Sequence, residues 1–253
     1  MKWTDIMEKL VGMVLLAGEL LLTCGAEMYR VEETIERMGI SAGFAQVESF
    51  ATPTGLFLSL HTSDGRVYTR VRRIRRSFSN LALISEINAI SRSFSSGETT
   101  IEDVTTRLKG LKKEGVPHNF LRLLMGGMGA AAFTVLYSGS GIEALIAGII
   151  GSIILLIDNK LEDYPIPNAL VAAVGAAVAA GLAKGAALLL TINTNVITLG
   201  AVMILAPGVV MTTAIRDMLS GELVSGVTRG AEALSIAVGI ATGVAIILSM
   251  GGN

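Results

Sequence analysis

A proline, a glycine, two threonines and an arginine–aspartate pair interrupt an apolar stretch near the C-terminal end of the chain. The segment is LAPGVVMTTAIRD, residues 205–217. Pro207 removes a backbone hydrogen bond and Gly208 loosens the turn, so a helix through this segment should be kinked or unwound there. If it breaks, the half-helix that follows exposes N–H groups and a positive dipole end inside the membrane. Such an end can hold an anionic group, for example a carboxylate.

Polar side chains follow the break at helical spacing. Thr212 and Thr213 add hydroxyl groups one turn further on, and Arg216 could pair with Asp217 or with a substrate carboxylate. A structural alternative stays open, because an Arg–Asp pair can also mark the cytoplasmic end of a span and proline kinks are common in membrane helices. The pattern predicts a substrate-binding group, which consists of Pro207, Gly208, Thr212, Thr213, Arg216 and Asp217.

Ionisable residues lie in or near other apolar segments, where such groups are costly and usually functional. Glu143 and Asp158 stand at opposite ends of one short segment, so both could reach interfacial water. Lys184 could extend its amine outward to the interface. Glu232 could face the break at Pro207 and carry a coupling proton.

The charges are divided unevenly along the 253 residues. Residues 1–118 hold 15 of the 20 Lys and Arg and 14 of the 21 Asp and Glu. Two solvents are implied, water for the first part and lipid for the second. The sequence predicts an α-helical integral membrane protein, with a cytoplasmic α+β domain at 1–118 and a five-helix transmembrane domain at 119–253.

Five apolar segments could span a bilayer, by their length or by packing inside a bundle. They are residues 120–138, 142–157, 168–190, 196–215 and 230–250. Basic residues favour the cytoplasmic side. They precede the first segment or lie in the links 158–167 and 216–229: Lys112, Lys113, Arg122, Lys160, Arg216 and Arg229. This asymmetry predicts a multi-pass protein of the cell (inner or plasma) membrane with a cytoplasmic N-terminus.

The first part should combine helices with a small sheet. Helix is predicted over residues 5–38, in two segments that meet near Cys24-Gly25 and end at Gly39. Three strands are predicted within 44–72, with a hairpin at Asp64-Gly65. Two helices should follow, over 78–94 and 101–113, with Ser77 capping the first and a Thr99–Glu102 capping box starting the second. The run VGMVLLAGELLL contains Glu19 and is interpreted as a buried amphipathic helix in preference to a span.

Several kinds of site lack support in the sequence. The run RVRRIRR, residues 70–76, has no accompanying aromatic pattern, so a solvated edge or contact with anionic headgroups is favoured over nucleic acid. We find no nucleotide-binding loop, zinc spacing or GxSxG motif, and only His61 and His118 are present. We therefore expect no enzyme activity, no cofactor, no metal site and no nucleic-acid partner.

A longer segment carries a family resemblance. PGVVMTTAIRDMLSGELVSGVTRGAEAL, residues 207–234, closely resembles the signature of the threonine/serine exporter family, in which Pro-Gly-Val precedes Thr-Asn-Ala-Ile-Arg-Asp, Gly-Asp/Glu, Ser-Gly and Arg-x-x-Glu-Ala. The matching positions are Pro207, Gly208, Thr212, Ala214, Ile215, Arg216, Asp217, Gly221, Glu222, Ser225, Gly226, Arg229, Glu232 and Ala233. Thr213 replaces the family's Asn. GAEMYRVEETIERMG, residues 25–39, is similar to the family's Gly-Ala-x-x-x-Arg-Val-Glu motif, with Arg30, Val31 and Glu32 in place.

The resemblance implies export of threonine and serine, driven by the proton gradient. Glu232, Lys184, Arg229, Arg30 and Glu32 become candidates for coupling or gating, and Arg30 and Glu32 could instead form a structural ion pair. Full-length family members resemble this chain followed by a second membrane half. The chain therefore looks like the separately encoded first half found in dicarboxylate (succinate) exporters, which implies a small membrane partner or a homo-oligomer. A membrane-anchored hydrolase and a regulatory subunit remain as alternatives of another class.

Overall fold

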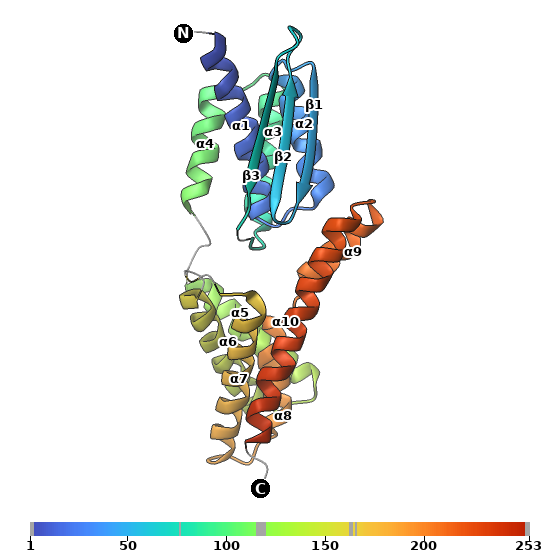
Figure 1. Ribbon diagram of the computed structural model, residues 1–253. Coiled ribbons are helices and arrows are strands. Elements are labelled where there is room, and N and C mark those ends of the chain that lie inside the picture. The colour runs from blue at the N-terminus through green and yellow to red at the C-terminus, as the bar shows by residue number, and fades with distance from the viewer. Residues whose placement is uncertain (1–2, 76, 115–119, 162–163, 165, 251–253) are drawn as a thin grey trace. The chain divides into compact units, whose positions relative to one another are not determined.

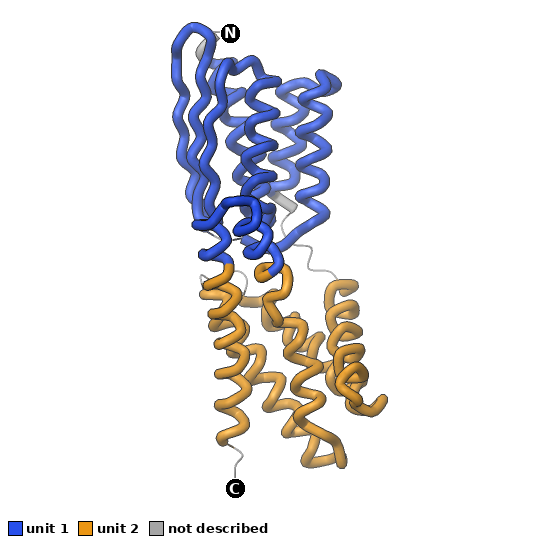
Figure 2. Tube along the Cα trace, turned by 90° about the vertical axis from the view of Figure 1, so that its right-hand side faces the viewer, with its two compact units in different colours: residues 1–116, 212–229 blue, residues 117–211, 230–253 orange. Residues whose placement is uncertain are grey.

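The computed structural model describes residues 3–75, 77–114, 120–161, 164 and 166–250. The chain divides into two compact units (Figure 2). Residues 1–116 with 212–229 form unit 1, and residues 117–211 with 230–253 form unit 2. The boundary predicted between residues 118 and 119 lies outside the described residues, as do Arg76 and His118. Part of the C-terminal signature thus belongs to the same unit as the N-terminal region.

Unit 1 combines helices with a sheet (Figure 1). The elements before residue 115 are α1 (Trp3–Thr23), α2 (Met28–Ser41), β1 (Gln46–Thr52), β2 (Gly55–His61), β3 (Val67–Arg73), α3 (Leu81–Ser95) and α4 (Ile101–Glu114). The described strands form an antiparallel sheet in the order β1-β2-β3. Gly65, in the predicted Asp-Gly hairpin between β2 and β3, has a φ of +82°, a conformation that glycine adopts without strain.

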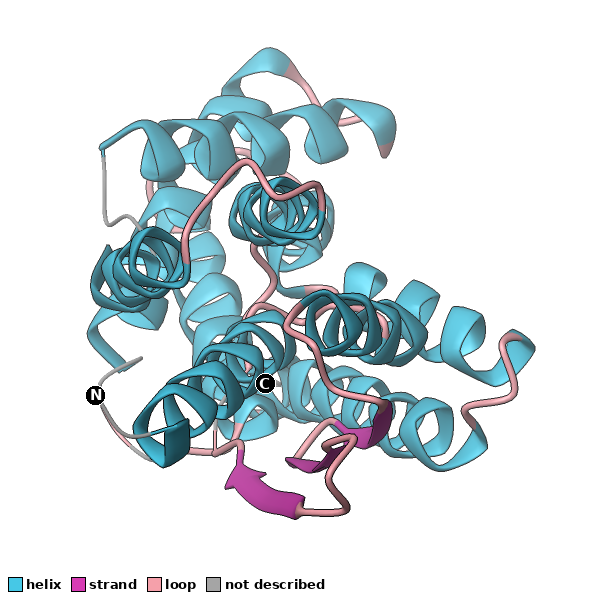
Figure 3. Cartoon of the chain, turned by 90° about the horizontal axis from the view of Figure 1, so that it is seen from above, coloured by secondary structure: helices cyan, strands magenta, loops and turns pink. Residues whose placement is uncertain are grey.

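Helices pack on one face of this sheet (Figure 3). Leu56, Leu58 and Leu60 alternate along β2 toward that face and are fully buried. On the opposite face Phe50 pairs in register with Phe57, and both are about half exposed. The period of two in the sequence of β2 therefore sets which face carries the core.

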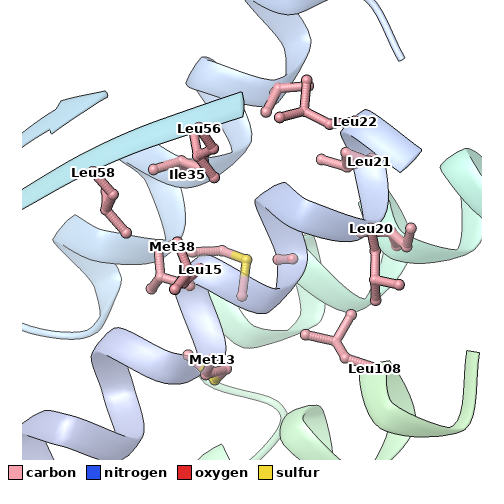
Figure 4. Close-up of a cluster of buried hydrophobic side chains, with 14 of the residues drawn as sticks. Met13, Leu15, Leu20, Leu21, Leu22, Ile35, Met38, Leu56, Leu58 and Leu108 are labelled. Carbon is pink, nitrogen blue, oxygen red and sulfur yellow. The ribbon is translucent and has the colours of Figure 1, made fainter. Parts of the chain in front are cut away.

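Helix α1 runs through the core of unit 1 (Figure 4). Met13 and Leu21 of α1 are almost fully buried with Ile35 of α2 and Leu58 of β2. Burying a side chain of this size contributes about 1.5–3 kcal/mol. The apolar run at the start of the chain is therefore part of the core, and the interpretation of this run as a buried helix is confirmed.

Three predicted helix ends in unit 1 were wrong. Helix α2 continues past Gly39, which is buried and packs so closely on Val47 that a Cβ there would lie 2.6 Å from its Cγ2. The cap of α3 is Asn80, whose side chain accepts the Leu83 N–H, and Ser77 lies before the helix. Thr100 caps α4 by accepting the Asp103 N–H, one residue after the predicted Thr99. Neighbouring Ser, Thr and Asn residues compete for a cap, and packing decides between them.

The regular elements in the described residues of unit 2 are all helices. It contains α5 (Phe120–Leu136), α6 (Gly141–Leu161), α7 (Asn168–Ala187), α8 (Thr194–Val202), the 3₁₀ turn η1 (Met203–Leu205), the first residues of α9 (Gly208–Leu219) and most of α10 (Leu223–Ser249). Its buried cluster consists mainly of alanine with isoleucine, for example Ala147, Ala176, Ala179 and Ile150. Large residues such as Leu145 and Ile149 are more than half exposed. Small residues inside and large apolar residues outside suit lipid as the surrounding solvent.

Among the described residues, α6, α7 and α10 are long and apolar enough to cross a membrane. Residues Thr194–Leu205 and Gly208–Leu219 pass the same test together, as a broken span or a re-entrant loop, and α5 is a shorter apolar helix. The protein is thus mostly helical with several candidate spans. The prediction of five spans stays a prediction.

Close packing of α10 on α7 leads to a first testable prediction. A Cβ at Gly243 would lie 2.1 Å from the backbone oxygen of Ala173, which cannot move aside as a side-chain tip can. Gly243→Ala should therefore lower the free energy of unfolding by about 1–3 kcal/mol. Gly181→Ala on α7 is the matched control, because nothing lies within 4 Å of a Cβ there. Equal thermal stability of the two purified variants would contradict this packing.

Candidate functional site

The predicted break in the apolar segment is present. Helix α8 ends at Val202 and the turn η1 at Leu205; the backbone of Ala206 is then extended (φ −60°, ψ 131°), and α9 begins at Gly208. The helices on the two sides are bent by 49°. Pro207 accounts for the break, since it has no N–H to continue the ladder. Helix α9 starts in unit 2 and continues into unit 1 from Thr212.

The signature after the break folds as a helix–turn–helix. Helix α9 ends at Leu219, Gly221 turns the chain with a φ of +90°, and α10 begins at Leu223. A Cβ at Gly226 would lie 2.9 Å from the backbone oxygen of Ala214, so the absence of a side chain lets α10 approach α9 closely. These glycines have a structural role in positioning the two helices.

A buried ion pair ties this hairpin together. The side chains of Asp217 and Arg229 are 0% and 8% exposed, and Oδ2 of Asp217 lies 3.4 Å from Nε of Arg229. The Met28 N–H donates to Oδ1 of Asp217 at 3.2 Å, and Arg229 donates to the Ala26 carbonyl at 2.7 Å. The pair therefore holds the hairpin against the link between α1 and α2. Through these buried contacts Arg229 fixes the hairpin in position.

Arg216 has a different partner from the one next to it in sequence. Its guanidinium pairs with Glu27, the residue before α2, and not with Asp217. Successive residues on a helix point about 100° apart, so neighbours do not face each other. Glu27 also pairs with Arg30, and its carboxylate is shared between the two arginines. The Arg216 side chain is 57% exposed, so it remains accessible.

The remaining candidates of unit 1 are spread along the same elements. Thr212 is exposed and Thr213 half-buried on α9. Glu32 accepts the Ala51 N–H at 2.8 Å, so the predicted ion pair between Arg30 and Glu32 is not formed. Both residues lie on α2, but each has its own partner.

The two candidates of unit 2, Glu232 on α10 and Lys184 on α7, each form a hydrogen bond with the other helix. Glu232 accepts a hydrogen bond from Asn168 at the start of α7 (2.8 Å). Lys184 donates to the Ile247 carbonyl near the end of α10 (2.7 Å). These are contacts between α7 and α10, and neither side chain is bonded at the break near Pro207, where Glu232 was expected to face.

Glu143 and Asp158 also have local partners in unit 2. Glu143 accepts the N–H groups of Ser140 (2.7 Å) and Asn193 (2.6 Å) and so joins the starts of α6 and α8. Asp158 lies 3.4 Å from Arg122. These contacts explain the two carboxylates as links between helix ends.

The pKa of Glu32 permits a test of its role. Burial raises this pKa above its ordinary value of 4.5, more than the Ala51 hydrogen bond lowers it, and nearby Glu222 raises it further. The folded state then holds the proton more tightly, so stability is lost as the pH rises from about 4.5 through the raised pKa. Glu32→Gln removes the titrating group and should flatten that part of the melting-temperature profile. If the melting temperature of Glu32→Gln falls with pH as steeply as that of the wild type, Glu32 is not the source of this pH dependence.

Sequence reasoning missed Glu27. It occupies an unspecified position of the Gly-Ala-x-x-x-Arg-Val-Glu motif, so the motif carried no signal for it. Only the fold places it beside Arg216, which lies 189 positions further on. Within the described residues no group of three or more His, Cys, Asp or Glu side chains could hold a metal ion.

Comparisons with known proteins agree with the signature. The profile of the ThrE family, described as "Putative threonine/serine exporter", matches residues 12–251. The "Probable succinate transporter subunit YjjP" of Escherichia coli strain K12 is 27% identical over 93% of this chain and 92% of its own length. The protein of that name in Klebsiella aerogenes is also 27% identical, over 92% of this chain and 90% of its own length.

A longer relative matches as well. The "Probable threonine/serine exporter" of Mycobacterium tuberculosis strain H37Rv is 21% identical over 95% of this chain but only 46% of its own length. No solved structure matches. The family match covers most of the chain and includes the broken helix, the candidate spans and the link between α1 and α2. The chain belongs to the threonine/serine exporter family of membrane transport proteins.

Proposed function

We propose that this chain is the first half of a two-component exporter of a small carboxylate-bearing metabolite, either threonine and serine or a dicarboxylate such as succinate. Two relatives that match it over more than nine-tenths of its length are named as transporter subunits, and a longer exporter matches it over less than half of that exporter's own length. A small membrane subunit would then supply the second half of the exporter. Self-assembly is the alternative.

The observation that carries this function is the break at Ala206-Pro207 in an otherwise apolar helix pair. A broken helix end favours negative charge, and transporters use such ends for carboxylates. We place Pro207, Gly208, Thr212, Thr213 and Arg216 along the substrate path, with Arg216 as the counter-charge, while Asp217, which is buried against Arg229, holds the hairpin that carries them. Its exposed guanidinium and its partner Glu27 support this role.

In this mechanism the Glu27 carboxylate occupies the position on Arg216 that a substrate carboxylate takes during transport. Glu27 neutralises Arg216 when no substrate is present, and a substrate carboxylate takes its place. Arg30 keeps Glu27 paired during the exchange, so no carboxylate is left without a cation. The proton gradient would drive export, with Glu232 at Asn168 as the coupling carboxylate. The protein would lie in the cell membrane with residues 1–118 in the cytoplasm, as the basic residues of the links favour.

The test is efflux of labelled threonine and labelled succinate from preloaded cells. Cells would express this chain alone, a candidate second-half subunit alone, or both. Loss of one label only with both chains would identify the substrate and establish a two-component exporter. Loss with this chain alone would support self-assembly. If neither label leaves in any combination while both chains are in the membrane, the export proposal is wrong.

A further inference from the structure

A polar hollow of about 200 Å³ lies on unit 1 between α2 and α3. Its lining has no part in the proposed substrate path except through Arg30. Besides Tyr29, the hollow is lined by Arg30, Glu33, Thr34, Arg37, Asn88 and Arg92. The hollow belongs to the part of the chain that packs around the sheet.

Helical spacing brings these residues together. Arg30, Thr34 and Arg37 follow one another by four and three positions on α2, so they share one face of that helix. Asn88 and Arg92 are four positions apart on α3. Three arginines thus border a space whose lining contains one carboxylate, Glu33. The excess of positive charge favours an anion.

Polar side chains line the hollow, and two of its arginines have N–H groups without an acceptor among the described residues. The Thr34 hydroxyl donates to Oδ1 of Asn88 at 3.3 Å, and Arg37 donates to Ser91 at 3.2 Å. Arg37 is also 3.3 Å from Glu33, while its buried Nε finds no acceptor in the part of the chain that the structure describes. Among those same residues the Arg92 guanidinium has neither an ion-pair nor a hydrogen-bond partner.

We propose that this hollow binds a small dianion, such as a dicarboxylate or inorganic phosphate. Guanidinium groups bind carboxylate and phosphate oxygens through paired N–H donors. The volume suits a ligand of that size, since sites for larger ligands occupy about 300–1,000 Å³. Tyr29 supplies no platform for a nucleobase, because its ring and hydroxyl already contact Arg30. The ligand would sit between Arg92 of α3 and the two arginines of α2.

Occupancy should influence the substrate path through Glu27. An anion in the hollow attracts Arg30 and so loosens its hold on the Glu27 carboxylate, which is then left to Arg216. A substrate carboxylate would have to displace a stronger pair, so the dianion would inhibit export. This consequence rests on the proposed function, whereas binding itself does not.

The experiment measures binding to the purified full-length chain in lipid nanodiscs by titration calorimetry, with succinate and with inorganic phosphate as separate probes. The variants are Arg92→Gln, Arg92→Lys, Arg216→Ala and Arg107→Gln. Arg107 is an exposed arginine of α4 outside the lining, so it controls for the loss of one positive charge. Melting curves of each variant establish that it is folded.

The wild type should bind at least one probe saturably, and Arg92→Gln should weaken binding by about tenfold or more. Arg92→Lys should bind more tightly than Arg92→Gln, and Arg107→Gln should bind as the wild type does, while Arg216→Ala should keep the binding that Arg92→Gln loses. The probe that binds tells a dicarboxylate from phosphate. No saturable binding, or equal binding by folded Arg92→Gln, would overturn the proposal. Binding lost in Arg216→Ala but kept in Arg92→Gln would also overturn it, because the ligand would then occupy the substrate path.

Discussion

Replacing Arg216 by alanine should abolish efflux of the substrate while the protein still reaches the membrane. Its guanidinium is exposed and held by Glu27, so its loss leaves no buried charge unpaired and should cost the fold little. Loss of the counter-charge to a desolvated carboxylate costs about 2–5 kcal/mol, which corresponds to a rate decrease of about thirtyfold or more. Efflux from preloaded cells, normalised to the amount of protein in the membrane, measures it.

Glu27→Gln separates a substrate contact from a structural pair. If Arg216 only braces Glu27, both variants should lose efflux together. If Glu27 is a placeholder for the substrate, Glu27→Gln should retain efflux, because it removes only the competitor for Arg216. Arg107→Ala on α4 controls for the change in net charge. Normal efflux from a well-expressed Arg216→Ala variant would reject the mechanism.

Replacing Arg229 by methionine should destabilise the protein far more than any change at Arg216. The substitution leaves Asp217 buried without its cation and removes the donor to the Ala26 carbonyl. Breaking a buried pair on one side costs about 3–5 kcal/mol. For a chain of this size that loss corresponds to a fall in melting temperature of about 6–20 °C. Melting of the purified protein in detergent would show it.

A double variant shows whether the pair itself is responsible. Arg229→Met combined with Asp217→Asn removes both charges, so the loss should be smaller than the sum of the two single losses. Arg216→Ala is the matched arginine substitution one position before Asp217, at an exposed site. Melting of Arg229→Met at the wild-type temperature would mean that the pair does not hold the hairpin.

The two arginines of the signature therefore have separate tasks. Arg229 is buried, holds Asp217 and fixes the hairpin to the link between α1 and α2, whereas Arg216 is exposed on the same hairpin and shares Glu27 with Arg30. Measuring stability and efflux for the same set of variants can separate these tasks. The Arg216 variant should lose efflux with an unchanged melting temperature. The Arg229 variant should have a lowered melting temperature.

Local features of this protein were determined by its sequence alone. Pro207 breaks the apolar helix because proline has no N–H, and Asp64-Gly65 turns the hairpin because glycine accepts a positive φ. The split in charge between residues 1–118 and the rest predicted two kinds of surroundings. The break and the turn each depend on neighbours within a few positions. The division into domains at residues 118 and 119 stays a prediction.

Only the tertiary structure decided which charged groups meet. The sequence placed Arg216 beside Asp217 and Arg30 near Glu32, but helix geometry turns such neighbours apart. Arg216 meets Glu27 because unit 1 includes residues 212–229 as well as the N-terminal region. The hollow lined by Arg37 and Arg92 likewise requires α2 and α3 to pack side by side. Such contacts join positions far apart in the chain, so they depend on the packing of whole elements, which no local pattern encodes.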